Sequence, residues 1–254
     1  MLPVIPGSKL LWGVVVVLVV GYVGGTWLNR RRSKIIGNWL QHSLSALGGQ
    51  PAWNLIGTMS SAVQLTVNHA SKPFRQLVIT YHMLTREFLP LLLLELLRGK
   101  RDLLALRADL RGNLPDEIEV VPRRGRLRRT LDQHAGSQPW NWQQAPAGLG
   151  LATHGPGDSA MAQGIMGFLE RYGRYVQRLS LRRRQPNLVL FVHLNGLERT
   201  PAAEFLRALQ QAIVVPETRD PVRRPPAVGV RGADLHAPTG PDDESRTEDG
   251  EVTP

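Results

Sequence analysis

The segment LLWGVVVVLVVGYVGGTWLNRRRSK, residues 10–34, decides which class of protein this sequence encodes. Its first 19 residues, 10–28, carry no charge. A helix of that length spans about 28 Å, close to the ~30 Å hydrocarbon core of a bilayer. Four cationic residues follow the run: Arg30, Arg31, Arg32 and Lys34. A cleaved signal peptide has its charges first and a shorter apolar run, and a helix of a soluble domain carries a polar stripe. We therefore expect a retained transmembrane helix rather than either alternative.

Four positions in this segment are candidate anchor residues. Trp12 and Trp27 lie near its two ends, where interfacial aromatic residues gather. Gly21 and Gly25 have the GxxxG spacing that lets two membrane helices approach closely, which makes this face a candidate contact for a membrane-protein partner. The alternative is that both glycines are ordinary members of a membrane helix.

The charges around the apolar run predict the topology. Cationic flanks stay on the cytoplasmic side of a membrane. We therefore expect residues 1–9 on the far side of the membrane and the rest of the chain in the cytoplasm. The membrane is the cell membrane or, in a eukaryote, that of the endoplasmic reticulum.

Composition narrows the chemistry of the chain. It has 254 residues, a net charge of +10 and no cysteine, which excludes disulfides, thiolate metal sites and cysteine nucleophiles. Residues 217–254 contain nine acidic and five basic residues, so the remainder carries a net charge of about +14. A surface this positive attracts anionic lipid or RNA when it is held at a membrane.

The positive charge is concentrated in three clusters. They are Arg30, Arg31, Arg32 and Lys34; then Arg123, Arg124, Arg126, Arg128 and Arg129; and then Arg182, Arg183 and Arg184. We expect these clusters to form solvated faces that also contact anionic lipid, with docking to ribosomal or other RNA as the alternative. No group of aromatic residues accompanies the arginines, as RNA-stacking modules require.

Apolar periodicity predicts an α+β domain over residues 51–215. Strand-like runs occupy residues 61–69, 74–84, 101–110, 116–123 and 187–194, although 101–110 also fits a helix. Helical spacing occurs at 35–47, 85–100, 159–179 and 200–214. We expect a mainly antiparallel sheet with helices on one face.

Several segments carry more specific expectations. Residues 29–50 should form a basic juxtamembrane amphipathic helix with Trp39 near the lipid headgroups. The leucine-rich helix 85–100, capped by Thr85, should be a core helix facing the sheet, with a second membrane span as the alternative. Residues 133–158 should be a long surface loop with one short extended piece. The Pro-rich acidic segment 216–254 lacks the apolar content to fold and should be a disordered tail.

The sequence contains no recognisable catalytic, nucleotide-binding or metal-binding motif. It lacks GxGxxG, GxxxxGK[ST], GxSxG and HExxH. His82 and His193 lie within predicted strands, and Asp102 has no obvious carboxylate partner. We therefore expect no catalytic residue, no metal, no cofactor and no small-molecule substrate. A membrane-tethered enzyme that uses His193, His82 or Asp102 on a small or lipid substrate is the alternative.

Several strings resemble the calumin-like family of endoplasmic-reticulum membrane proteins, which are subunits of the PAT complex of the multipass translocon. They are WLNRRRSKIIGNWLQHSLSAL (27–47), FRQLVITYHMLTREFLPLLLLELLRG (74–99), the set Phe168, Leu169 and Tyr172, and NLVLFVHLNGLERTPAAEFLRALQQAI (187–213). The resemblance covers roughly residues 10–215. It does not include the family's long C-terminal coiled coil, so ribosome contact through that element is not implied.

The resemblance implies a non-enzymatic role near translocon-engaged ribosomes. Together with the anchor, it predicts a single-pass membrane protein that acts as a binding or scaffold module and aids the insertion or folding of other membrane proteins. Translocon components, the ribosome and the bilayer are the expected partners. An anionic-lipid or RNA-binding adaptor is a further alternative.

Overall fold

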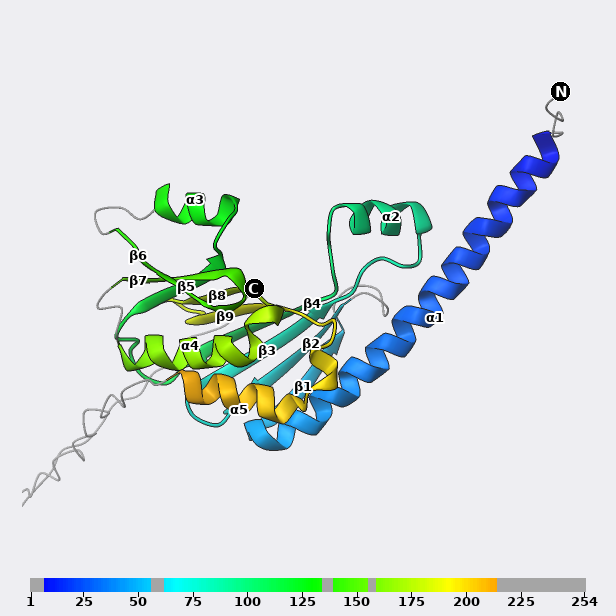
Figure 1. Ribbon diagram of the computed structural model, residues 1–254. Helices are drawn as coiled ribbons and strands as arrows, with labels where there is room; N and C mark the ends of the chain where they lie inside the picture. The colour runs from blue at the N-terminus through cyan, green and yellow to red at the C-terminus, as the bar shows by residue number, and fades with distance from the viewer. Residues whose placement is uncertain (1–6, 56–61, 134–138, 155–158, 214–254) are drawn as a thin grey trace, which may run out of the picture. The chain divides into compact units, whose positions relative to one another are not determined.

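An antiparallel sheet forms the centre of the computed structural model, which describes residues 7–55, 62–133, 139–154 and 159–213 (Figure 1). The nine strands follow the order β1-β2-β3-β4-β9-β8-β5-β7-β6, and every neighbouring pair is antiparallel. The strands are β1 (Gln50–Leu55), β2 (Ala62–Asn68), β3 (Phe74–His82), β4 (Leu103–Leu110), β5 (Glu117–Pro122), β6 (Asn141–Gln144), β7 (Leu149–His154), β8 (Val176–Leu181) and β9 (Leu188–His193). The expected α+β fold with an antiparallel sheet is confirmed.

Helices cover mainly one face of this sheet. They are α1 (Gly7–Leu47), α2 (Leu89–Leu97), α3 (Arg126–Gln133), α4 (Ala160–Tyr172) and α5 (Ala202–Ala212), with short 3-10 turns η1 (Pro146–Gly148), η2 (Gly173–Tyr175) and η3 (Leu197–Arg199). Helices α4, α5 and the C-terminal part of α1 lie against the same face, whereas α3 lies on the other side near β6 (Figure 1).

Side-chain alternation explains why the helices cover that face. In β4, Leu104 and Leu106 point to one face of the sheet and are buried in the core, whereas Arg107 points to the other face and is exposed. The central strand β9 buries Leu190 in the same way, beside the aromatic residues of α4 and α5. The hydrophobic effect therefore drives the helices onto this side.

Helix α1 is continuous over 41 residues but has two parts of different character. Its N-terminal part is apolar and exposed, and it contains a segment long and apolar enough to cross a membrane, with a mean hydropathy of 2.0 over an 18-residue window. Its C-terminal part packs on the domain, where Ile36 and Leu40 are each 1% exposed. Trp39 lies against the domain, where its Nε1 donates to the Thr200 carbonyl oxygen at 2.6 Å and its ring packs near Phe205; its position near lipid headgroups stays a prediction.

Two predicted boundaries are wrong because sheet pairing overrides local periodicity. The helix expected at residues 159–179 ends at Tyr172, and Val176–Leu181 instead form β8 between β9 and β5. Leu179 fits an apolar helical face, but it also fits the inward side of a strand. The loop expected at 133–158 contains β6, which was not predicted, and the buried strand β7, which matches the short extended piece expected there.

Smaller differences concern an edge strand and helix starts. Strand β1 was not predicted, because Pro51 and the polar residues of QPAWNL are atypical of a strand; at a sheet edge they are tolerated. Helix α2 begins at Leu89, so Thr85 does not cap it. The predicted tail, residues 216–254, lies outside the described residues.

Candidate membrane interface and basic pocket

A buried carboxylate joins the long helix α1 to the sheet. Asp102, immediately before β4, is 1% exposed. Its Oδ2 accepts from Arg32 Nε at 2.9 Å and from Arg86 Nη2 at 2.7 Å, and its Oδ1 accepts from the Leu84 backbone N–H at 2.9 Å. The charge-assisted bonds link α1, the segment after β3 and the start of β4.

A second polar residue of α1 completes this junction. Asn29 is buried; its side-chain amide donates to the Leu84 carbonyl oxygen at 3.2 Å, and its Oδ1 accepts from Arg86 Nη1 at 2.7 Å. Arg86 therefore bridges Asn29 and Asp102. The direction in which α1 leaves the domain is fixed by a network of buried polar groups, which we call the junction (Asn29, Arg32, Leu84, Arg86 and Asp102).

The junction uses one member of the first basic cluster, and the other three members remain exposed. Arg32 is committed to Asp102 and to the Asn195 side-chain oxygen. Arg30, Arg31 and Lys34 stay exposed, and the Arg31 guanidinium lies 5.7 Å from the Trp27 ring centroid. These three cations are the members of the cluster that remain exposed to solvent.

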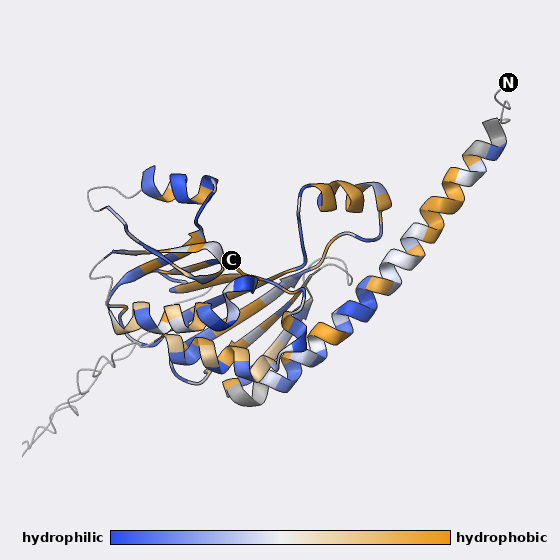
Figure 2. Cartoon of the chain, viewed as in Figure 1, coloured by the Kyte–Doolittle hydropathy of each residue, from blue (hydrophilic) through white to orange (hydrophobic). Residues whose placement is uncertain are grey.

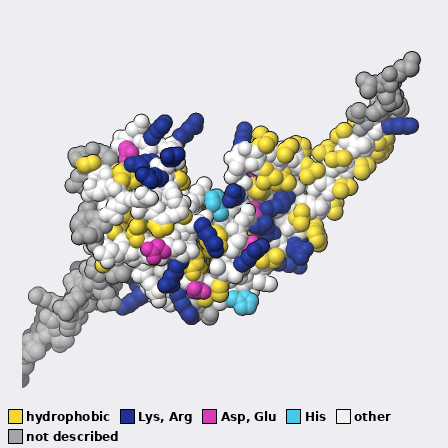
Figure 3. All heavy atoms as spheres, viewed as in Figure 1, with side chains coloured by type: hydrophobic (Ala, Val, Ile, Leu, Met, Phe, Trp, Pro, Cys, Tyr) yellow, Lys and Arg dark blue, Asp and Glu magenta, His cyan; other side chains and the backbone are white. Residues whose placement is uncertain are grey.

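Helix α2 is not a core helix, so that prediction is wrong. None of its described residues is buried, and Leu93 and Leu97 are 61% and 78% exposed. An apolar patch of this kind marks a surface that meets lipid or another protein. Figure 2 shows that α2 and the N-terminal part of α1 are the hydrophobic elements outside the domain core, and Figure 3 shows their apolar side chains on the same side of the molecule.

The glycines of the predicted GxxxG pair face the approach to α2. A Cβ at Gly25 would overlap the Arg86 carbonyl oxygen, and one at Gly21 would lie 2.7 Å from Leu89 Cγ. The close approach that GxxxG allows is thus used within the chain. Trp12 and Trp27 point outward and are 69% and 59% exposed.

Apolar hollows lie between α1 and α2. One, of about 770 Å³, is lined by residues such as Val14, Leu18 and Leu93. The other, of about 440 Å³, is lined by residues such as Gly24, Leu28 and Leu92. We call the two together the apolar groove; it lies along the part of α1 that is long enough to span a membrane.

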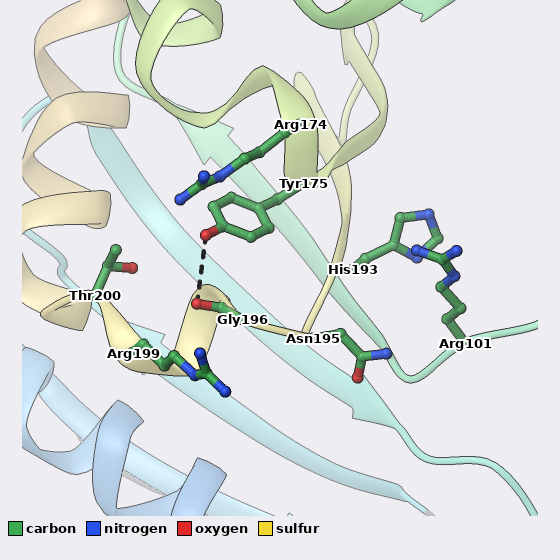
Figure 4. Close-up of a pocket in the computed structure, with 8 residues that line it drawn as sticks. All are labelled: Arg101, Arg174, Tyr175, His193, Asn195, Gly196, Arg199 and Thr200. Carbon is green, nitrogen blue, oxygen red and sulfur yellow. Dashed lines mark hydrogen bonds between the residues drawn. The ribbon is translucent and has the colours of Figure 1, made fainter.

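A basic pocket of about 430 Å³ opens at the end of β9, and sequence analysis missed it (Figure 4). Its lining residues are Arg101, Arg174, Tyr175, His193, Asn195, Gly196, Arg199 and Thr200. The three arginines come from different segments and lie outside the three clusters that the sequence analysis named, so no cluster signalled them. Arg101 and Arg199 lie beside the ends of predicted elements, whereas Arg174 lay inside the predicted helix 159–179 and carried no signal.

The second and third predicted clusters have structural partners. Arg128 lies over the Trp142 ring at 4.6 Å, and Arg123 donates to Gln144 Oε1 at 3.2 Å. Arg182 binds the buried carboxylate of Glu119 at 2.7 Å, and Arg183 donates to the Pro115 carbonyl oxygen at 2.9 Å. Arg124, Arg126, Arg129 and Arg184 are exposed.

The residues named for an enzymatic alternative do not converge. His82 and His193 pair with Leu103 from opposite sides, so one strand separates them. Asp102 is held in the junction, away from the pocket lining. Burial and the nearby Arg101 charge lower the pKa of His193, which favours its neutral form at neutral pH. Among the described residues that line this pocket there is no carboxylate.

Among the described residues, no group of three or more His, Cys, Asp or Glu side chains is placed to hold a metal ion. Comparison with protein-family models and with curated proteins finds no match to this chain. The resemblance to the calumin-like family therefore stays a prediction.

Proposed function

We propose that this chain is a non-enzymatic membrane protein that binds other membrane proteins, newly inserted ones near the translocon and ribosome included. Helix α1 crosses the bilayer once, the sheet domain lies in the cytoplasm, and α2 rests in the adjoining leaflet. The apolar groove between α1 and α2 receives an apolar helix of the partner.

The observation that carries this proposal is the exposed apolar surface of α2 beside the membrane segment. Fully burying one leucine side chain contributes roughly 1.5–3 kcal/mol, so leaving Leu93, Leu94 and Leu97 in water would be costly. The junction fixes α1 relative to the domain, and the Gly25 contact fixes α2 relative to α1. Both apolar surfaces are thus held in one orientation, as a binding platform requires.

Small residues in the groove favour a helix as the occupant. Gly13 and Gly24 line its two hollows, and a Cβ built on either would meet nothing within 4 Å. Small residues let a second backbone come close in a membrane, where van der Waals packing drives helix association. The groove therefore suits a transmembrane segment.

Site-specific photocrosslinking in native membranes tests the proposal. A photoreactive residue replaces Leu93 in the groove, or Leu127 on α3 as a matched control, since Leu127 is also an exposed leucine at 42%. We expect Leu93 to give products with integral membrane proteins that Leu127 does not give, and puromycin should diminish those formed with nascent chains. Products with lipid alone from Leu93, or the same products from both sites, would refute the proposal.

Protease accessibility tests the topology separately. Protease added outside intact cells should leave the sheet domain undigested, because the cationic flank of α1 keeps it in the cytoplasm. Permeabilised cells provide the control. Digestion of the domain in intact cells would overturn the orientation.

A further inference from the structure

The basic pocket has a charge composition that points to an anionic ligand. Three guanidinium groups line it, from Arg101 before β4, Arg174 in η2 and Arg199 in η3. Within the described parts of the chain, no carboxylate lies within 4.0 Å of any of them. Like charges gathered without a counter-charge repel one another, so an anion among them is favourable.

The pocket also has fixed geometry and uncharged donors. The Arg174 guanidinium lies 4.7 Å from the centre of the Tyr175 ring, and the Tyr175 hydroxyl donates to the Gly196 carbonyl oxygen at 3.4 Å (Figure 4). The Asn195 side-chain oxygen accepts from Arg32, which leaves its NH₂ group as a donor. The volume of about 430 Å³ is within the range of small-ligand sites.

The position of the pocket identifies the source of the anion. Asn195 in its lining is bonded to Arg32, which lies four residues beyond Leu28 at the end of the apolar run. At 1.5 Å per residue, Arg32 is about 6 Å from that end along α1. The headgroup layer on each side of a bilayer is roughly 5–7 Å thick. With α1 in a membrane, the Asn195 side of the pocket lies at headgroup depth, whereas Thr200, which is bonded to Trp39 further along α1, lies on the cytoplasmic side of the pocket.

We infer that this pocket binds the phosphate group of an anionic lipid headgroup, through Arg101, Arg174 and Arg199. Guanidinium groups form paired, charge-assisted hydrogen bonds with phosphate oxygens. The inference rests on the proposed insertion of α1 in a membrane, but it needs no protein partner in the groove. It assigns arginines outside the three sequence clusters as the specific lipid contacts.

His193 adds a pH dependence to the site. Arg101 and burial lower its pKa, whereas a bound phosphate would offset the arginine charge and favour the protonated ring. The charged and titratable groups that line the pocket with His193 are Arg101, Arg174, Arg199 and Tyr175. A bound phosphate is therefore expected to raise the pKa of His193 relative to the empty pocket.

Binding of phosphatidic acid to the full chain in phosphatidylcholine nanodiscs tests the inference. We expect the double variant Arg174→Gln/Arg199→Gln to bind phosphatidic acid at least about ten-fold more weakly, because it loses two of the three guanidinium groups that would form charge-assisted hydrogen bonds with phosphate oxygens. The control is Arg184→Gln with Arg124→Gln, which removes the same charge elsewhere. Arg184 lies in the turn between β8 and β9, at the opposite end of that hairpin from the pocket.

The outcomes separate the alternatives. Equal affinity of the double variant and the wild type would overturn the inference, and so would an equal loss in the control, because that indicates general electrostatic attraction. A second arm uses inorganic phosphate and glycerol 3-phosphate with the protein in neutral detergent. Binding of either as tightly as of phosphatidic acid would show that the source is a free phosphate compound and overturn the lipid assignment. None of these results depends on the crosslinks that test the proposed function.

Discussion

Asp102 and Glu119 are both carboxylates with no more than 1% of the side chain exposed, and each is held by two arginines. The partners of Glu119 all come from one paired strand: Arg178 and Ser180 lie on β8, which pairs with β5, and Arg182 directly follows β8. Asp102 instead draws Arg32 from α1 and Arg86 from the segment before α2.

The comparison shows two uses of the same chemistry. Burying a charge costs several kcal/mol, and well-placed partners offset that cost without adding much net stability. At Glu119 the charges hold two adjacent strands together. At Asp102 they set the direction of the long apolar helix α1 relative to the folded domain. The junction therefore fixes the orientation of α1 relative to the domain more precisely than apolar packing alone would.

The largest effect is expected from Asp102→Ala. It would leave Arg86, only 15% exposed, and the Leu84 N–H without their acceptor. Removing one partner of a buried pair costs about 3–5 kcal/mol. Urea unfolding in detergent should show this loss, and hydrogen exchange should increase at residues 29–43 of α1. The control Asp109→Ala, in the same strand but more exposed, should change stability by less than about 0.5 kcal/mol. Unchanged exchange in α1 would remove the distinction between the two carboxylates.

The glycine contact between α1 and α2 should give the next largest effect. In Gly25→Ala the new methyl group overlaps the Arg86 backbone, so α2 must move away at a cost of about 1–3 kcal/mol. Gly24→Ala is the matched control, because nothing lies within 4 Å of its Cβ. Spin labels at Val17 and Leu93 should report a longer distance for Gly25→Ala alone. Equal distances in both variants would show that α2 is held by the junction rather than by this contact.

Glu119→Gln should have a smaller effect than Asp102→Ala. Its partners Arg178 and Arg182 are 31% and 46% exposed, so water can replace part of what they lose. We expect a loss of about 1–3 kcal/mol. Exchange should increase in β5 and β8 and stay unchanged in α1. Increased exchange in α1 would mean that the two carboxylates belong to one cooperative network.

The sequence predicted well what local periodicity determines. Alternation identified β2, β3, β4, β5 and β9, and an uncharged run identified the apolar part of α1. The sequence-based prediction failed where pairing between strands determines the structure. An example is β8, whose apolar positions also fit one face of a helix. The predicted core helix at α2 failed for another reason. Leucine-rich composition indicates burial in an apolar medium, but it does not distinguish protein from lipid.

The site was predicted less well than the fold, because its charges are paired over long sequence separations. Arg32 was assigned to lipid as part of a run, yet its partner Asp102 lies 70 residues away. Asp102 itself had no visible partner in the sequence. Arg101, Arg174 and Arg199 line one pocket because the start of β4, the turn η2 before β8 and the turn η3 after β9 lie at the same end of these neighbouring strands.

The smallest expected effect concerns His193, where the surrounding charges are unmatched. Burial and Arg101 lower its pKa in the folded state below the ordinary value of 6.5. The unfolded chain then binds more protons than the folded one just below pH 6.5, so stability should fall as the pH drops through that window. Thermal unfolding between pH 7 and 5 should show a shallower slope for His193→Asn. Arg101→Gln should also reduce the slope, whereas Arg184→Gln should not. Equal slopes for His193→Asn and the wild type would mean that the pocket arginines do not make protonation of His193 unfavourable in the folded state. The unmatched charges of the pocket would then have no measurable effect that sets them apart from the matched charges around Asp102.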